Sequence, residues 1–319
     1  MKEFEVIKEF FTAQPVNRKD VAMGIGDDCA LIRASDSKYI AITTDTLVCG
    51  VHFPTDTPAR AIGHKAVAVN LSDLAAMGAE PAWISVAVTL PTVDREWLAE
   101  FTAGIFELTE YFNVQLIGGD TTSGPLSITI TAQGTVPQGK ALCRNGAGNG
   151  DWVYVTGEIG EAGLALQALR EQVSLSPREM QHAMDALNYP KPQVLAGQVV
   201  REYASAAIDI SDGLLADLTH LCQASTLGIS LDVNDLPIAP VLLNKLGEEG
   251  AARLALTAGD DYQLIFTVPD TNKVALETEL KQANIKSSCI GQMNKSQEII
   301  ISRGETRLSF AESGFEHFS

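Results

Sequence analysis

Residues 42–53 read ITTDTLVCGVHF, and they place hydroxyl and carboxylate side chains directly after a strand-forming run. The apolar residues 39–42 predict a β-strand that delivers Thr43, Thr44 and Asp45 at its end. Side chains at strand ends in open α/β sheets leave the packed sheet and line a crevice, where ligands bind. Mg²⁺ prefers oxygen ligands of this kind, together with water and phosphate. The stretch therefore predicts either a cation site or an ordinary strand end with a capping aspartate.

The composition is typical of a folded globular protein. Of the 319 residues, 45% are hydrophobic and 20% are charged, and a chain of this length is expected to form two domains. The formal net charge is -17. A nucleic acid or an anionic membrane is therefore not expected as a partner, because like charges repel unless cations mediate. An acidic chain that binds phosphates has to do so largely through divalent cations.

The cysteines and the first residues predict a cytoplasmic protein. The five cysteines are odd in number and form no CxxC pair, which favours reduced thiols. Residues 1–11 mix acidic, basic and apolar side chains, so we expect no signal peptide there. No apolar run approaches the roughly 20 residues that a membrane-spanning helix needs. We therefore expect no membrane partner.

Two further segments of the first half carry aspartates beside glycines. Residues 24–28 read GIGDD, and the charges of Asp27 and Asp28 repel each other unless a cation or a hydrogen-bond donor compensates them. The alternative is a polar turn before a strand. A short strand over 114–117 is expected to end in a glycine turn that carries Asp120.

The helix predicted over 59–77 carries another acidic group. Its apolar stripe continues to Asp73, and a carboxylate on such a face is costly to bury unless it is paired or bound to a metal. The alternative is an aspartate at the edge of the stripe that accepts from a backbone donor. His64 and Lys65 of this helix are expected to face solvent.

The second half follows a glycine-rich seam at 144–151 and contains its own acidic loop. Arg144 in the seam is a candidate phosphate ligand, because a guanidinium can bridge two oxygens; the alternative is an exposed linker arginine. A strand over 206–210 leads into Asp209 and Asp212. A helix cap explains Asp212, whereas no capping role explains Asp209 inside an apolar strand.

Hydrophobic periodicity elsewhere predicts alternating helices and strands, and hence an α/β protein. The predicted helices are 95–112, 162–170, 192–203, 272–283 and one that follows Gly213 and runs through Cys222. The predicted strands are 83–90, 126–136, 152–156, 263–268, 298–302 and 306–310.

The recurring aspartates predict a protein that holds several Mg²⁺ ions. Several cations are useful where two polyanions must meet, as in phosphoryl transfer between phosphates. Two unit charges about 4 Å apart repel by about 4 kcal/mol even at an effective dielectric constant of about 20. A non-catalytic acidic module that binds a metal or a nucleotide is the alternative from a different class.

The chain resembles the thiamine-monophosphate kinase family over essentially its whole length. The motifs occur in the family's order: GIGDDCALI (24–32), TTDTLVCGVHF (43–53), HKAVAVNLSDLAAMGAEP (64–81), IGGDTT (117–122), RNGAGNGDWVYVTG (144–157), DISDGL (209–214), AGDDYQLIFTVP (258–269) and GFEHF (314–318). The second motif is the most specific, whereas GDD and GGD recur across the wider aminoimidazole-ribonucleotide-synthetase-like, or PurM-like, superfamily.

The resemblance implies an ATP-dependent enzyme that phosphorylates thiamine monophosphate to thiamine diphosphate by direct in-line transfer of the γ-phosphate. It implies a two-domain PurM-like α/β architecture with mixed sheets, in which residues 1–137 bind ATP and metal and dimerise, and residues 148–319 form a C-terminal α/β domain. A homodimer is therefore expected. Within the superfamily, an ATP-using ligase or dehydratase that activates an amide or carbonyl oxygen is the alternative.

The resemblance also assigns contacts residue by residue, without a covalent catalytic side chain. The implied metal ligands are Asp28, Thr43, Thr44, Asp45, Asp73, Asp120, Asp209 and Asp212. The implied ATP contacts are Gly119, Asp120, Arg144 and Ser211. The implied substrate contacts are His52, Asp260 and Phe315, and the ring of Phe315 is expected either to stack on a heteroaromatic ring of the substrate or to plug the fold. The family usually reads Gly-Glu-Asp where this chain has Gly259-Asp260-Asp261, so the acidic side chain at that contact is shorter.

Overall fold

The structure, a computed structural model, describes residue 9 and residues 17–23, 31–32 and 37–310. The predicted acidic loop with Asp27 and Asp28 lies outside the described residues, and so does the aromatic tail with Phe315. Within the described ranges, no helix combines the length and the apolar character that a membrane crossing requires.

The chain divides into two compact units, and each is described by itself. The first comprises Met1–Leu74 and Ala79–Gly139, and the second comprises Ala75–Gly78 and Lys140–Ser319. The domain boundaries predicted from the sequence, 1–137 and 148–319, remain predictions.

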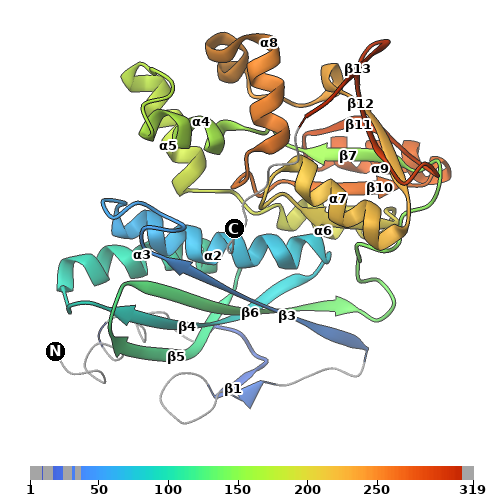
Figure 1. Ribbon diagram of the computed structural model, residues 1–319. Coiled ribbons are helices and arrows are strands. Elements are labelled where there is room, and N and C mark those ends of the chain that lie inside the picture. The colour runs from blue at the N-terminus through green and yellow to red at the C-terminus, as the bar shows by residue number, and fades with distance from the viewer. Residues whose placement is uncertain (1–8, 10–16, 24–30, 33–36, 311–319) are drawn as a thin grey trace. The chain divides into compact units, whose positions relative to one another are not determined.

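The first unit contains a four-stranded mixed sheet with two helices on one face (Figure 1). The strand order is β3-β6-β4-β5, with β3 at Lys38–Val48, β6 at Ser127–Pro137, β4 at Glu80–Leu90 and β5 at Gln115–Ser123. Strand β6 pairs antiparallel with β3 and β4, and β5 runs parallel to β4. The helices are α2, Ala59–Ala76, and α3, Arg95–Tyr111. A two-stranded sheet pairs β1, Val21–Met23, with β2, Leu31–Ile32.

The two faces of the four-stranded sheet differ because side chains alternate along each strand. On β6, Ile128 and Ile130 are buried on the helix-covered face, whereas Thr129 and Thr131 are half-buried on the opposite face. On the neighbouring β3, Ile42 shares the side of Thr131 and is 65% exposed. One face of the sheet is therefore covered by helices, and no helix among the described residues of this unit covers the other, which we call the open face.

Two strands are longer than predicted from the sequence. Strand β3 pairs with β6 along all 11 of its residues, so Thr43, Thr44 and Asp45 lie inside the strand and not at its end. Strand β5 likewise continues through Gly119 and Asp120 instead of ending in a glycine turn. Threonine is common in strands, and pairing with neighbouring strands satisfies the backbone of Asp45, Gly119 and Asp120, whose strand propensity is weak, so the sheet overrides the local signal. Both predicted strand ends are wrong.

The helices α2 and α3 cross at a close contact between glycines. A side chain at Gly63 of α2 would overlap a backbone carbonyl of α3, and a side chain at Gly104 of α3 would overlap the carbonyl of Arg60. Because the helices approach so closely, His64 and Lys65 are buried, at 9% and 4% exposure. The expectation that these two side chains face solvent is wrong.

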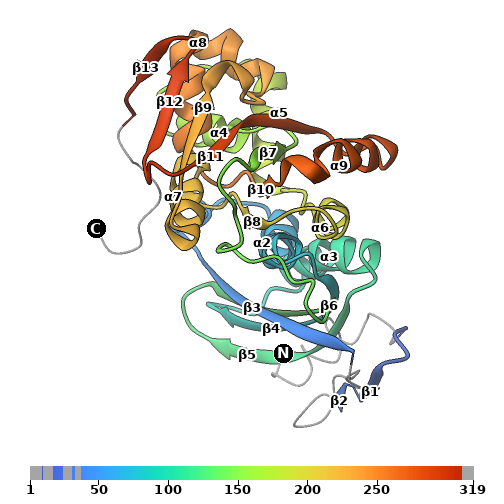
Figure 2. The ribbon, with the colours of Figure 1, turned by 90° about the vertical axis from the view of Figure 1, so that its right-hand side faces the viewer.

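The second unit is built on a seven-stranded sheet (Figure 2). Its order is β13-β12-β9-β11-β7-β10-β8, and all neighbours pair antiparallel except β12 and β9. The strands are β7 (Trp152–Thr156), β8 (Ala206–Asp209), β9 (Gly228–Asp232), β10 (Leu264–Val268), β11 (Ser287–Asn294), β12 (Ile299–Arg303) and β13 (Thr306–Leu308). The helices are α4 (Glu161–Leu169), α5 (Pro177–Asn188), α6 (Val194–Val200), α7 (Leu214–Ser225), the short η2 (Val233–Asp235), α8 (Pro240–Thr257) and α9 (Asp270–Gln282).

The main core of the second unit holds α7 against the sheet. Leu218 and Leu221 of α7 are buried in one hydrophobic cluster with Val155, Ile208 and Ile265 from three adjacent strands. This packing fixes the start of α7 close to the end of β8. The loop between these two elements, which carries several predicted site residues, is therefore held at both ends.

The sequence analysis did not identify α5, α8, β9 or β11. Strands β9 and β11 contain several serines and glycines, which have weak strand propensity, and only pairing in the sheet stabilises them. Helix α5 did carry a recognisable signal: Ser176 and Glu179 form a capping box, and Pro177 opens the helix.

Replacing Gly104 with alanine is expected to destabilise the protein, because the added methyl group would overlap the carbonyl of Arg60. Overpacking of this kind lowers the free energy of unfolding by about 1–3 kcal/mol. Urea unfolding followed by circular dichroism measures the change. Gly118→Ala is the control, since a methyl group there has no neighbour within 4 Å. The same unfolding midpoint for both variants would contradict the role of the helix contact.

Candidate active site

An acidic pair lies on the helix-covered face of the first unit's sheet. Asp45 on β3 lies beside Asp73 on α2, and burial together with the nearby Asp73 carboxylate raises the pKa of Asp45 to about 6. The hydroxyl of Thr43 donates a hydrogen bond to Asp73. Thr43 and Asp45 are two residues apart on a strand and so share one face. The structure thus brings together three of the predicted metal ligands.

The chemistry of this trio suits a divalent cation. Two neighbouring carboxyl groups repel each other when both are ionised, and a bound cation removes that repulsion. Carboxylate and hydroxyl oxygens are the hard ligands that Mg²⁺ accepts. Thr43, Asp45 and Asp73 are therefore the residues of the first unit that would hold it.

Two other predicted residues near β3 have different surroundings. The Thr44 side chain points to the opposite face from Asp45, where its hydroxyl is 2.9 Å from that of Thr131. His52 lies in the turn after β3, and its Nδ1 accepts a hydrogen bond from the backbone N–H of Val48 at 3.0 Å. This bond orients the imidazole ring and places the proton of its neutral form on Nε2.

Gly119 and Asp120 lie on β5, at the opposite edge of the sheet from β3. Three strand spacings separate the two edges, about 14 Å along the sheet. Both residues are exposed. Gly119 has a φ of 154°, and a side chain there would overlap the carbonyl of Val86, so only glycine fits. Asp120 and Asp45 therefore lie at opposite edges of the sheet, and the structure does not bring these two predicted ligands together.

In the second unit, the loop after β8 and the loop after α8 are joined by backbone hydrogen bonds. The N–H of Asp260 donates to the carbonyl of Ser211 at 2.9 Å. The N–H of Tyr262 donates to the carbonyl of Ile210 at 2.8 Å, and the N–H of Ile210 donates to Gln263 at 2.8 Å. Residues that are far apart in the sequence are thereby fixed side by side.

This pairing gathers four predicted site residues: Asp209, Ser211, Asp212 and Asp260. Asp209 is the last residue of β8 and is 4% exposed, whereas the other three are half-buried. A side chain at Gly259 would overlap the carbonyl of Ser211, so the loops can approach this closely only with glycine at that position. The second unit thus places three carboxyl groups and a hydroxyl on one pair of loops.

A further carboxylate, Asp217, lies directly behind the first of these loops. One of its oxygens accepts hydrogen bonds from the backbone N–H groups of Ser211, Asp212 and Gly213, at 3.1, 3.2 and 3.2 Å. Burial raises the pKa of Asp217 to about 7, and the neighbouring Asp212 contributes, although the three N–H groups act in the opposite direction. Asp217 belongs to the first turn of α7 and is 3% exposed.

The loop with Asp260 has an unusual backbone. Asp260 and Tyr262 have φ angles of 66° and 49°, a region that side chains other than glycine rarely adopt. The Tyr262 hydroxyl donates a hydrogen bond to Asp260 at 3.0 Å. Between them, Asp261 accepts from the N–H of Gly160 at 2.8 Å, and burial raises the pKa of Asp261 well above its usual range. Asp261 thus supports the start of α4, while Tyr262 orients Asp260.

Arg144 is exposed in a loop along the outer edge of β8. The N–H of Ala207 in β8 donates to the carbonyl of Cys143 at 3.3 Å. Ser225, the last residue of α7, donates through its hydroxyl to the carbonyl of Arg144 at 2.8 Å and accepts from the N–H of Ala147 at 3.3 Å. The Arg144 loop is therefore tied to the two elements that flank Asp209 and Ser211.

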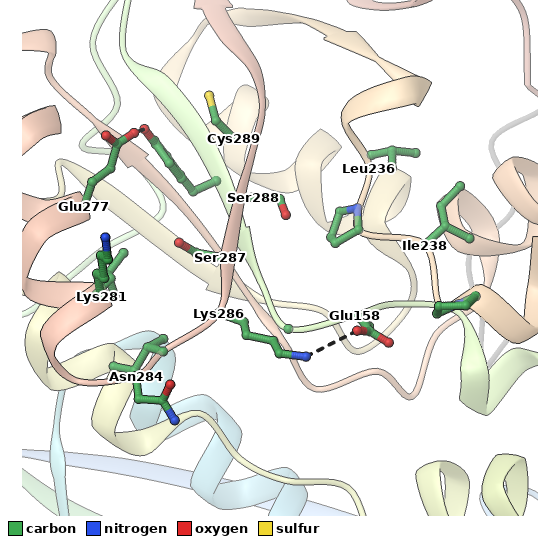
Figure 3. A pocket seen from close by; sticks show the side chains of 16 residues that line it. Glu158, Leu236, Ile238, Glu277, Lys281, Asn284, Lys286, Ser287, Ser288 and Cys289 are labelled. Carbon is green, nitrogen blue, oxygen red and sulfur yellow. Dashed lines mark hydrogen bonds and ion pairs between the residues drawn. The ribbon is translucent and has the colours of Figure 1, made fainter.

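A cavity of about 700 Å³ in the second unit has none of the predicted site residues in its lining (Figure 3). In its wall, Lys286 forms an ion pair with Glu158 at 3.5 Å. Tyr154 donates a hydrogen bond to Glu277 at 2.6 Å. Because its walls carry both acidic and basic groups and none of the predicted site residues, we do not assign the phosphate chemistry to this cavity.

The structure adds Asp217, Asp261 and Tyr262, which the sequence analysis did not single out. Asp217 did carry a signal, since a carboxylate among the apolar residues of a predicted helix is costly unless it is satisfied. Asp261 and Tyr262 carried none, because their roles depend on a left-handed backbone and on a helix start that is distant in sequence.

Profiles of two families match the chain: AIR synthase related protein, N-terminal domain, over residues 26–136, and AIR synthase related protein, C-terminal domain, over residues 148–303. The chain is 45% identical over 320 residues to thiamine-monophosphate kinase of Escherichia coli strain K12, which covers 99% of this chain and 98% of that protein. The crystal structure of thiamine-monophosphate kinase from Stenotrophomonas maltophilia K279a is 39% identical, with a TM-score of 0.87, and the match covers 93% of this chain and 95% of that one. AaThiL complexed with AMPPCP and TMP is 29% identical, with a TM-score of 0.77, and the match covers 90% and 89% of the two chains.

In metal-free protein, Asp45→Asn is expected to stabilise the fold more at pH 8 than at pH 5. The folded state raises the pKa of Asp45 from 3.8 to about 6. A carboxyl group with such a shift favours the folded state while it is protonated, and this contribution is lost as the pH rises from about 4 to about 6. At pH 8 the asparagine removes the cost of burying an ionised carboxylate beside Asp73, on the order of 2 kcal/mol. Thermal unfolding in EDTA at both pH values measures the difference, and an equal effect at both would contradict the raised pKa of Asp45.

Proposed function

The chain belongs to the thiamine-monophosphate kinase family, and from this premise we propose that it transfers the γ-phosphate of ATP to thiamine monophosphate, giving thiamine diphosphate and ADP. The observation that carries the proposal is the identity of 45% with an enzyme of that name along 99% of this chain. AaThiL, which was complexed with AMPPCP, an analogue of ATP, and with TMP, supports the same pair of substrates. The ligase and dehydratase alternatives have no comparable support over the full length.

The proposed reaction needs no covalent intermediate on the protein. A phosphate oxygen of thiamine monophosphate, ionised at neutral pH, attacks the γ-phosphorus of ATP in line, and the bond to the bridging oxygen of the departing ADP breaks. Bound Mg²⁺ would neutralise the phosphate charges and bridge their oxygens. The protein's own task is to hold the cations and to orient the two phosphates.

We propose ligands for Mg²⁺ in each of the two units, taken separately. In the first unit, Thr43, Asp45 and Asp73 are the gathered donors, and Thr44 and Asp120 are the further predicted ligands. In the second unit the proposed ligands are Asp209 and Asp212. Asp28, the remaining predicted ligand, lies outside the described residues.

The proposed ATP contacts are Gly119, Asp120, Arg144 and Ser211. Arg144 is exposed and belongs to a loop tied to β8 and α7. Its guanidinium can therefore reach phosphate oxygens beside the Ser211 loop and bind two of them at once. Ser211 offers a hydroxyl whose backbone is already fixed by two neighbouring chain segments.

The proposed contacts with thiamine monophosphate are His52, Asp260 and Phe315. His52 is oriented by its bond from Val48, and Asp260 is oriented by the Tyr262 hydroxyl. The shorter aspartate at position 260 is thus held in place by a partner in the same loop. Phe315 lies outside the described residues. We also propose a cytoplasmic location, which the free state of the four described cysteines supports.

The open face of the first unit's sheet supports a homodimer. Ile40 and Ile42 on β3 are 42% and 65% exposed. On the same face the hydroxyls of Thr46 and Thr129 lie 2.8 Å apart, so side chains of β3 and β6 form a continuous surface. Exposed apolar groups on a flat sheet are typical of a protein–protein interface. We propose that two copies of the chain associate through this face.

Ile42→Glu is expected to weaken the proposed dimer, because burying an unpaired carboxylate between two sheets is strongly unfavourable. Size-exclusion chromatography with light scattering would show a shift from dimer to monomer as the protein is diluted. Val274→Glu on α9, where the native side chain is 74% exposed, is the control and should leave the mass unchanged. A variant at position 42 with an unchanged dimer would move the interface elsewhere.

A coupled assay with ATP, Mg²⁺ and thiamine monophosphate is expected to yield thiamine diphosphate and ADP in equal amounts. Free thiamine should accept no phosphate, since the proposed acceptor is a phosphate oxygen, and EDTA should stop the reaction. Asp120→Asn is expected to lower kcat/KM by at least about 100-fold, because a metal ligand is lost, without a change in thermal unfolding.

Glu110→Gln, on the exposed surface of α3, is the matched control for the loss of one negative charge. ADP formation without thiamine diphosphate would assign a different acceptor. Near-normal turnover of the Asp120 variant would remove Asp120 from the metal site.

A further inference from the structure

Asp217 has a hydrogen-bonding arrangement that an ordinary helix cap does not have. Its Oδ2 accepts from three successive backbone N–H groups, those of Ser211, Asp212 and Gly213. These residues precede α7, so the carboxylate reaches backwards from the first turn and binds the loop instead of the free N–H groups of its own helix. One side chain therefore determines the orientation of three consecutive peptide groups.

The loop is held from its other side as well. The carbonyl of Ser211 accepts from the N–H of Asp260, while its N–H donates to Asp217. Gly213 has a φ of 125°, and a side chain there would approach the backbone of Thr257 and Ala258 closely. Both polar groups of the Ser211 backbone are thus bound, and the loop has little room to move. Removing the Asp217 carboxylate would release one of its two sides.

Fold stability alone does not account for Asp217. The side chain is 3% exposed and lies close enough to Asp212 for the two carboxyl groups to interact unfavourably. Among the described residues, no lysine or arginine forms an ion pair with it. A buried carboxylate without a basic partner is costly unless backbone donors compensate. The three N–H groups provide that compensation, and in return the carboxylate orders the segment that carries Ser211 and Asp212.

We propose that Asp217 is a positioning residue for phosphoryl transfer: it fixes the backbone of residues 211–213 and so places Ser211 and Asp212 for ATP and its cations. The inference rests on the proposed function, because the roles of Ser211 and Asp212 do. Asp217 itself touches neither substrate. Its loss should act on the ATP side of the reaction more than on the acceptor side, since the side chain of Asp260 keeps its hydrogen bond from the Tyr262 hydroxyl.

Asp217→Ala is the primary test, with steady-state kinetics in which ATP, Mg²⁺ and thiamine monophosphate are varied in turn. The expected result is at least a tenfold increase in the KM for ATP and in the Mg²⁺ concentration for half-maximal rate. The KM for thiamine monophosphate should change less than threefold. Asp217→Asn keeps one carbonyl oxygen as acceptor for the three N–H groups and should restore both ATP-side values to within threefold of the wild type.

Asp232→Ala is the matched control in the same unit. The carboxylate of Asp232 also accepts two backbone N–H groups, from Asn234 and Gly304, at 2.9 and 2.8 Å, but none of the proposed contacts lies there. This variant should lower the unfolding temperature and leave all three kinetic values unchanged. If Asp217→Ala behaves in the same way, Asp217 is a structural residue only and the proposal is overturned.

A second substitution keeps the test decisive if Asp217→Ala does not fold. Asp217→Glu retains the charge but displaces the carboxylate by one methylene group. The proposal therefore requires the same increase in the KM for ATP as in Asp217→Ala. A wild-type KM for ATP in this variant would overturn it.

The wild-type assay separates the two proposals. If the wild type transfers phosphate to another acceptor, the rate of ADP release still gives the KM for ATP and the Mg²⁺ concentration for half-maximal rate. If it turns over no acceptor, the affinity for AMPPCP with Mg²⁺, measured by calorimetry, takes their place. In the first case the quantity compared is the KM for ATP, and in the second it is the affinity for AMPPCP. A tenfold weakening in Asp217→Ala that Asp217→Asn restores supports the positioning role. The same value in Asp217→Ala and the wild type refutes it.

Discussion

Repulsion between closely spaced carboxyl groups is the constraint on which the candidate site depends. Asp45 and Asp73 come from different elements, and burial together with the nearby Asp73 carboxyl raises the pKa of Asp45 to about 6. Such an arrangement is unfavourable in isolation, and a divalent cation would relieve it. This is the physical basis on which we propose that the fold holds these groups for a cation.

In the second unit, hydrogen bonds of the backbone hold the acidic groups close together. The loops after β8 and α8 are joined by hydrogen bonds, and both depend on glycines at points of close approach, Gly213 and Gly259. Left-handed backbone at Asp260 and Tyr262 adds local strain, which the surrounding contacts compensate. Acidic groups on such loops keep their positions without a ligand, so the proposed binding of phosphates and cations would require little reorganisation.

Much of the fold was predictable because periodicity reports which face of an element is buried. Helices α2 and α3 and strand β7 agree closely with the predicted ranges. The errors have a common cause: β3 and β5 run on through polar residues and glycines because neighbouring strands pair with them. The burial of His64 and Lys65 also follows from a contact between two helices, which no local signal records.

The amino-acid sequence was sufficient for the family, the acidic character of the site and the identity of its candidate ligands, because these depend on residue type and motif order. It did not reveal which of those residues meet. Asp45 and Asp73 are gathered by a helix lying across a sheet, and Asp260 is brought to Ser211 by backbone pairing between distant loops. Asp217 acquired its role in the same way. Proximity of this kind arises from long-range packing and strand pairing, and it cannot be predicted from the residues that flank each position.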